Sequence, residues 1–207
     1  MKPLIRHCVA LFVLSTAYSG LAAAEQEVYR FDPVHSQVWF GVSHQRFSHP
    51  LGRLKIKDGW FQFDPEEVEH SRVDVEIDLK SVDMGDGKWN DTIKSSQFFE
   101  TDRWPTARFT SKRVEATGDA AGVIHGDLTL HGATKPVDVE FKINRVGSDP
   151  YTFKSKAGFS AHAKLNRGDF GMKRYQEVVG ESVELIIEIE GIRDRAATEK
   201  EEKKDGN

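Results

Sequence analysis

The chain has 207 residues, with 29 Lys and Arg against 33 Asp and Glu, and its formal net charge is −4. This negative balance argues against a general nucleic-acid-binding protein, which normally carries a basic surplus. A single cysteine excludes a disulfide framework and a cysteine-based zinc site. The 13 Phe, 4 Trp and 4 Tyr residues supply enough core material for a folded domain.

The first residues have the three parts of a secretory signal peptide. Lys2 and Arg6 make a positive start, residues 9–21 are apolar and small, and Ala22–Ala24 offer small side chains for cleavage. A transmembrane anchor is the alternative, but about 13 apolar residues are too few to span a bilayer of ~30 Å. We therefore expect residues 1–24 to be removed, which leaves a mature chain without cysteine and with a net charge of −6.

Strict alternation of apolar and polar residues dominates the body of the chain. Residues 72–80, 137–143 and 183–190 each place aliphatic or aromatic side chains on one face and mostly charged side chains on the other. Residues 153–165 alternate too, but Ala157, Ala161 and Ala163 leave room on the apolar face. About eight such strands, joined mostly by short turns, predict an all-β antiparallel barrel or sandwich with one buried face.

Two segments break this alternation. Trp89, Ile93 and Ser96 recur at helical spacing, so we expect one short helix over residues 88–97, with Asp91 in its first turn. Residues 193–207 are densely charged and have no side chain larger than alanine that could anchor them in a core, which predicts a disordered tail. The expected organisation is a signal peptide at 1–24, one β-domain at 25–192 and a tail at 193–207.

No familiar catalytic arrangement is present in the mature sequence. It has no cysteine nucleophile, no Gly-x-Ser-x-Gly elbow and no phosphate-binding glycine loop. Its seven histidines are scattered, with no spacing typical of a metal site, although two or three could still meet across strands. We therefore expect no catalytic residue, no metal and no cofactor.

A barrel of about eight strands either fills with side chains or holds one small ligand. Apolar faces rich in Val, Ile, Leu and Phe, with small residues on one strand, would suit a long apolar molecule. Periodicity alone leaves a solid core and a ligand-holding barrel equally open.

The sequence resembles the YceI-like family of periplasmic, lipocalin-like, polyisoprenoid-binding proteins. The similar segments are 29–36 (YRFDPVHS), 91–99, 126–137 (GDLTLHGATKPV), 166–171 (NRGDFG) and the strand at 183–190. The resemblance covers residues 28–192. Residues 43–51 are more basic and histidine-rich than the resemblance leads us to expect, in a region where loops would frame a barrel mouth.

The resemblance implies an extended, antiparallel, eight-stranded, lipocalin-like barrel that holds an isoprenoid lipid of polyprenyl or quinone type in the periplasm. Inward apolar side chains are the expected ligand contacts, provided that the aliphatic face points inward. The candidates are Phe40, Val42, Val75, Ile77, Phe109, Leu128, Val139, Phe141, Phe159, Leu185 and Ile187.

Polar matches to the family leave two interpretations open. His35 or Arg167 could steady a phosphate or a quinone oxygen. Alternatively, Arg167 could pair with Asp169 or Asp91 and tie the loop 166–181 to the barrel, because a buried arginine needs a partner and a carboxylate is a natural one. We favour the structural role.

A periplasmic carrier for an isoprenoid lipid is the function that these expectations favour. One alternative is an enzyme that acts on such a lipid through His35 or His44. Another is a stress-response or redox-linked interaction module that contacts a membrane protein. A transient membrane contact and a dimer are both compatible with the sequence, and no nucleic-acid partner is expected.

Overall fold

The computed structural model describes residues 27–198, which form nine strands and one short helix. The predicted signal peptide and residues 199–207 of the predicted tail lie outside this range. No helix within the described range is long and apolar enough to cross a bilayer. The strands are β1 (Glu27–Phe31), β2 (Gln37–His44), β3 (Leu51–Phe63), β4 (Arg72–Asp83), β5 (Thr106–Gly118), β6 (Ala121–Leu130), β7 (Ala133–Ser148), β8 (Ser155–Asn166) and β9 (Val179–Arg193).

The nine strands make an eight-position antiparallel barrel, because β1 and β2 share one position between β3 and β9. The end of β3 pairs with β1, and its beginning pairs with β2. Pairing of β3 with β4 closes the sheet on itself. The predicted eight-stranded antiparallel barrel with one short helix is therefore confirmed, although β1 was not foreseen as a separate strand.

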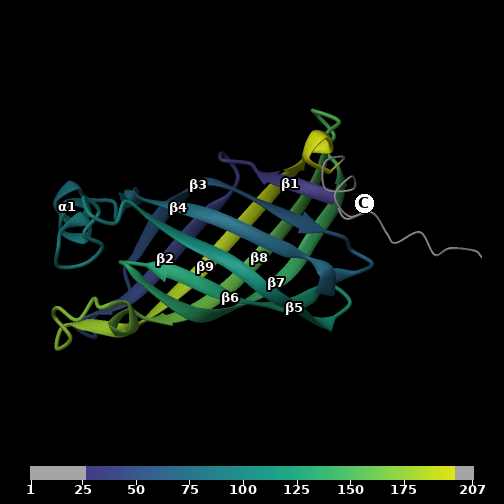
Figure 1. Ribbon diagram of the computed structural model, residues 1–207. Helices are drawn as coiled ribbons and strands as arrows, with labels where there is room; N and C mark the ends of the chain where they lie inside the picture. Colours follow the sequence, from purple (N-terminus) through teal and green to yellow (C-terminus); the bar gives the residue numbers. More distant parts are fainter. Residues whose placement is uncertain (1–26, 199–207) are drawn as a thin grey trace, which may run out of the picture.

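Alternation along the strands sets the barrel interior. In β7, Val137, Val139 and Phe141 are buried, and the residues between them are exposed. The long strands run diagonally from one end of the barrel to the other (Figure 1). The sequence pattern thus defines one continuous apolar interior.

One end of the barrel carries the helix and the longest irregular loop. Helix α1 (Gly87–Lys94) follows β4, and a 3₁₀ turn (Arg167–Phe170) with the loop after it precedes β9. Figure 1 shows both segments at the same end, away from β1. We call this end the mouth and the end with β1 and the β7–β8 turn the closed end.

Helix α1 differs slightly from the prediction. It spans 87–94 rather than 88–97, and the Asp86 carboxylate caps it by accepting the Trp89 N–H at 3.0 Å. Asp91 lies in the middle of the helix and is exposed. Asp91 is therefore not in the first turn as expected, and the acidic residue at the start of the helix is the N-cap Asp86, five positions earlier.

The described part of the predicted tail is packed against β1. Arg193 ends β9, and residues 195–198 make one helical turn. The Thr198 hydroxyl is buried and accepts the Val28 N–H at 3.0 Å. Arg30 and Asp194 form an ion pair at 3.2 Å. These contacts differ from the prediction that disorder begins at 193, because a threonine and an aspartate supply hydrogen bonds where no large apolar anchor is present.

Candidate ligand-binding site

The barrel interior contains an apolar cavity of about 520 Å³ at the mouth. This volume falls within the range of small-molecule sites, roughly 300–1,000 Å³. Strands β2, β4, β6 and β9 supply its walls, and α1 with its following segment and the loop before β9 surround its upper part. The cavity excludes the solid-core alternative for this half of the barrel.

A second cavity of about 180 Å³ lies deeper in the barrel. It shares four wall residues with the first, namely Val38, Ile77, Leu128 and Leu185. We call these four residues the waist. An elongated ligand that enters at the mouth would have to pass the waist to reach the second cavity.

Aromatic side chains close the barrel beyond the second cavity. Phe61 stacks on Tyr29 with ring centroids 5.0 Å apart, and Phe159 contacts Phe61 edge-on at 5.4 Å and Phe63 at 5.1 Å. Phe61, Phe63 and Phe159 also line the second cavity. This cluster forms the floor of the interior.

Every apolar residue proposed from the sequence as a ligand contact faces one or both cavities. Those on the mouth cavity are Phe40, Val42, Ile77, Leu128 and Leu185. Those on the second cavity are Val75, Ile77, Phe109, Leu128, Val139, Phe141, Phe159, Leu185 and Ile187. Which of them a ligand touches stays a prediction.

Arg167 also lines the mouth cavity, and its side chain is almost fully buried. Its Nε donates to the Gly180 carbonyl at 2.8 Å, its Nη2 donates to the Val179 carbonyl at 2.9 Å, and its Nη1 donates to the Met172 carbonyl. Burial lowers the pKa of Arg167, but a guanidinium stays protonated in proteins. One of its donors is thus committed to the loop before β9 and two to the first residues of β9.

Arg167 pairs with neither of the two carboxylates that were expected. Asp169 and Asp91 are both exposed, and the arginine bonds to backbone carbonyls instead. A buried guanidinium needs acceptors, and backbone carbonyls of the loop and of the start of β9 supply them here. Arg167 therefore has a structural role, but it joins the segment after β8 to the start of β9 through the backbone and not through a carboxylate.

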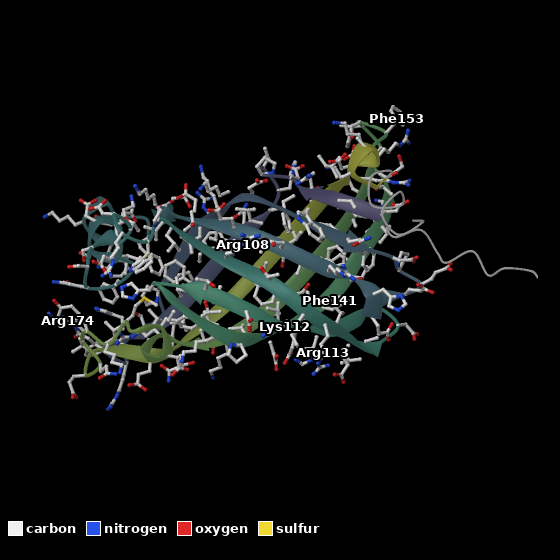
Figure 2. The ribbon with its side chains drawn as sticks, in the orientation of Figure 1. Arg108, Lys112, Arg113, Phe141, Phe153 and Arg174 are labelled. Atoms are coloured by element: carbon white, nitrogen blue, oxygen red, sulfur yellow. The ribbon has the colours of Figure 1, made fainter. Side chains whose placement is uncertain are left out.

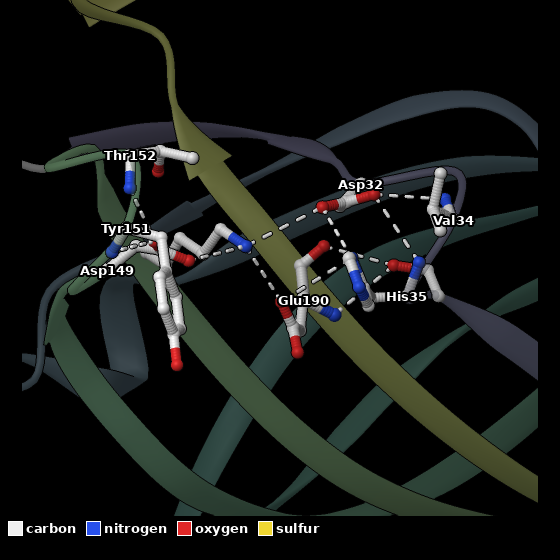
Figure 3. A network of polar contacts seen from close by, with 9 residues as sticks. Asp32, Val34, His35, Asp149, Tyr151, Thr152 and Glu190 are labelled. Carbon is white, nitrogen blue, oxygen red and sulfur yellow. Dashed lines mark hydrogen bonds and ion pairs between the residues drawn. The ribbon is translucent and has the colours of Figure 1, made fainter.

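His35 lies at the closed end, outside both cavities. Its Nδ1 is 2.9 Å from the Asp32 carboxylate, which also accepts the Val34 N–H at 2.9 Å (Figure 3). The hydrogen bond with Asp32 raises the pKa of His35. Burial alone would raise the pKa of Asp32, but its hydrogen bonds with His35 and Val34 outweigh burial and lower it. In this position, His35 is unable to steady the head group of a lipid held in the mouth cavity.

The same cluster is the only group of metal-ligating side chains that converges within residues 27–198. Ligand atoms of Asp32, His35 and Glu190 lie within 4.8 Å of one another. However, the Lys156 ammonium is 3.1 Å from Glu190, 3.7 Å from Asp32 and 3.1 Å from Asp149. A cation of the chain itself therefore already pairs with these carboxylates, which fits a structural ion-pair network.

Several mouth residues were missed from the sequence. The two segments that cover the mouth contribute Trp89, Phe98, Phe99, Met172 and Tyr175 to the cavity wall. They also meet each other, since the Tyr175 hydroxyl donates to Gln97 at 3.1 Å and its ring stacks on Phe98. The available signal was a set of large apolar residues inside segments that have no strand period.

The family model for the YceI-like domain matches residues 29–191. This match spans most of the chain, from β1 to the end of β9. The chain belongs to the YceI-like family. Protein YceI of Shigella flexneri is 37% identical over 161 residues, which cover 78% of this chain and 83% of that protein.

Solved structures show the same barrel in other YceI-like proteins. A YceI protein of Campylobacter jejuni matches with a TM-score of 0.65 and 27% identity, over 73% of this chain and 90% of that one. A domain of Saccharophagus degradans described as polyisoprenoid-binding matches with a TM-score of 0.58 and 15% identity, over 80% of this chain and 98% of that one. The second likeness concerns the fold alone.

Proposed function

We propose that the chain binds a long isoprenoid lipid of polyprenyl or quinone type in its barrel and carries it through the periplasm. The observation that carries this proposal is the pair of adjoining apolar cavities, which run from the mouth through the waist toward the aromatic floor. A long, narrow and apolar interior suits a flexible hydrocarbon chain better than a compact polar metabolite.

Burial of the hydrocarbon chain would supply the affinity. Each methylene removed from water contributes about 0.8 kcal/mol, so a few isoprene units would bind without any special polar contact. The polar side chains around the mouth cavity are His44, Thr92, Gln97, Arg167 and Tyr175. We place the head group among them, where Gln97 and Tyr175 already form a hydrogen bond.

Relatives support the ligand class, and the sequence supports the location. The Saccharophagus domain with the same fold is described as polyisoprenoid-binding. The N-terminal sequence predicts export by a cleavable signal peptide, which suits a soluble carrier between membranes. We propose binding without turnover, because His35 lies outside the cavities and Arg167 is held by backbone carbonyls. His44 does line the mouth cavity, so the enzyme alternative now depends on that residue alone.

Native mass spectrometry tests this function on protein purified from its own periplasm without detergent, followed by organic extraction of the bound material. We expect a discrete added mass that extracts as a polyprenyl or quinone species. Repeated preparations with only the apo mass would contradict the proposal. Conversion of the bound lipid during incubation would replace the carrier by an enzyme.

A pair of neighbouring substitutions locates the lipid in the barrel. Leu128→Trp places an indole at the waist, whereas Thr129→Trp places the same ring on the exposed face of β6. We expect Leu128→Trp to lose the added mass or to retain a shorter lipid, and Thr129→Trp to behave as the wild type. Equal retention by both variants would place the lipid elsewhere.

A further inference from the structure

Two loops at the mouth lie side by side and project from the barrel. They are residues 45–50, between β2 and β3, and residues 173–178, before β9, and we call them the mouth loops. The Gln45 N–H donates to the Val178 carbonyl at 2.6 Å, and His44 pairs with Val179. The two loops therefore form one connected surface.

The mouth loops expose large apolar side chains to solvent. Phe47 is 88% exposed, and Tyr175 is 48% exposed. Val178 is exposed on the same loop as Tyr175, and Trp89 of α1 is exposed beside His44, at a ring distance of 6.0 Å. Tyr175, Val178 and Trp89 also line the mouth cavity, so this apolar surface is continuous with the proposed lipid site.

Positive charge accompanies these apolar residues. Arg46, Lys173 and Arg174 are exposed on the mouth loops, where Glu177 is the one acidic residue. The chain as a whole has a net charge of −4. The loops therefore reverse the sign of the charge of the whole chain, which matches a negatively charged surface.

Backbone geometry fixes how the loops present their side chains. Gln45, Arg46 and Tyr175 have φ angles of 51°, 61° and 57°, in the left-handed region that residues other than glycine rarely adopt. Each such residue costs on the order of 1–3 kcal/mol and persists only when its surroundings hold it. The surrounding structure therefore holds the two loops in a conformation that their own backbone preferences would not select.

We propose that the mouth loops dock on an anionic lipid bilayer, with Phe47 inserted at the interface and Arg46, Lys173 and Arg174 on the head groups. Aromatic and basic side chains together are the composition that binds such interfaces. The docked protein would present its mouth cavity directly to the membrane. The biological purpose of this contact rests on the proposed function, because a lipid carrier must load and unload at a bilayer.

The closed end provides a matched control surface. Phe153 is 83% exposed in the β7–β8 turn, nearly as much as Phe47. Figure 2 shows Phe153 and Arg174 at opposite ends of the barrel. In that turn, Lys154 is balanced by Asp149, and Lys156 is paired with Asp149 and Glu190, so the cationic excess is absent.

Co-sedimentation with vesicles tests the docking. The full mature chain is mixed with vesicles of phosphatidylcholine alone or of phosphatidylcholine with phosphatidylglycerol. We expect binding to the anionic vesicles that weakens with salt. The Phe47→Ala change should lower the partition coefficient about tenfold, as expected for the loss of one inserted aromatic ring. The double change Lys173→Gln and Arg174→Gln should lower it roughly twenty-five-fold, at about fivefold for each charge.

Phe153→Ala should bind vesicles as the wild type does. The proposal is overturned if the wild type fails to sediment with anionic vesicles at low salt, or if Phe153→Ala weakens binding as much as Phe47→Ala. Lipid extraction from the same preparations separates the two proposals. Bound isoprenoid without vesicle binding would remove the docking surface alone, whereas vesicle binding by a protein that never contains lipid would remove the carrier function alone.

Discussion

The mouth and the closed end of the barrel are built from the same long strands but are filled differently. At the closed end, Tyr29, Phe61, Phe63 and Phe159 pack ring against ring. At the mouth, mainly aliphatic walls leave a cavity of about 520 Å³. Alternation decides which side chains face inward, and the size of those side chains decides whether the interior is solid or hollow.

Truncation of a floor aromatic should have the largest effect on stability. Phe61 is buried, contacts Tyr29, Phe31 and Phe159, and forms part of the floor of the second cavity. Phe61→Ala removes all three ring contacts and enlarges that cavity, which the rigid neighbouring rings are unable to refill. We expect a loss of about 3–5 kcal/mol in the free energy of unfolding. Urea denaturation of the apo protein measures it.

The corresponding change at the mouth should cost much less. Phe98 is only half-buried and stacks on the Tyr175 ring, so Phe98→Ala loses less buried apolar surface and fewer ring contacts than Phe61→Ala does. We expect a loss of roughly 1 kcal/mol, close to that of an average substitution. Equal losses for Phe61→Ala and Phe98→Ala would mean that the two ends are packed alike.

Arg167 is the exception at the mouth, because it is buried and its three hydrogen bonds hold the loop before β9 and the first residues of β9. Arg167→Ala leaves the carbonyls of Met172, Val179 and Gly180 without their charged donor. We expect a loss of about 2–3 kcal/mol. Thermal melts and lipid titrations together should show a larger effect on stability than on lipid affinity.

Arg167→Lys is the matched variant, since it keeps the charge but not the fork of donors. It should recover only part of the lost stability. An unchanged melting temperature for Arg167→Ala with lost lipid binding would instead assign the guanidinium to the ligand head group.

Local alternation was sufficient to predict antiparallel strands with one buried face, in a barrel or a sandwich, and the resemblance to the YceI-like family selected the barrel. The strands at 72–80, 137–143 and 183–190 fall within β4, β7 and β9, with the aliphatic face inward. The division of one barrel position between β1 and β2 was not predictable in this way. It depends on β3 pairing with one strand at its start and the other at its end, which is a long-range property.

The candidate site was only partly predictable for a similar reason. Strand residues such as Phe40 and Leu185 could be assigned to the interior by their period. Trp89, Met172 and Tyr175 lie in segments without a strand period, and their inward position depends on how the loops fold over the mouth. The choice of carbonyls by Arg167 likewise follows from the shape of the loop before β9.

Removal of the hydrogen bond that joins the two segments across the mouth should have only a small effect on stability. Tyr175→Phe keeps the ring that stacks on Phe98 but loses the hydroxyl that bonds Gln97. Because this bond is exposed, we expect a stability loss of about 0.5 kcal/mol. Lipid exchange between vesicles should become faster if the bond restrains the two segments, and an unchanged exchange rate would show that it does not.

The smallest expected effect is a pH dependence at the closed end. The pKa of His35 is raised by its hydrogen bond with Asp32, so this pair stabilises the fold fully at pH values below the unfolded histidine pKa of about 6.5. The contribution is lost as the pH rises through the raised folded value. Because His35 is largely exposed, solvent screens the pair and its contribution is small.

Urea unfolding of the wild type and of His35→Gln across this range measures the contribution. The stability difference between the two proteins should be largest near pH 5 and should shrink toward pH 8, since neutral histidine and glutamine are alike in charge. Hydrogen bonds from the Thr152 and Tyr151 N–H groups and from Lys156 lower the pKa of Asp149 in the same network, so its contribution is lost only as the pH falls through that lowered value. Stability of the closed end should therefore decline on both sides of a mildly acidic optimum. Lipid retention at the mouth should vary with pH in the same way in the wild type and in His35→Gln, since both keep His44 on the mouth cavity. A lipid affinity that follows the titration of His35 would show that the two ends are coupled through the barrel.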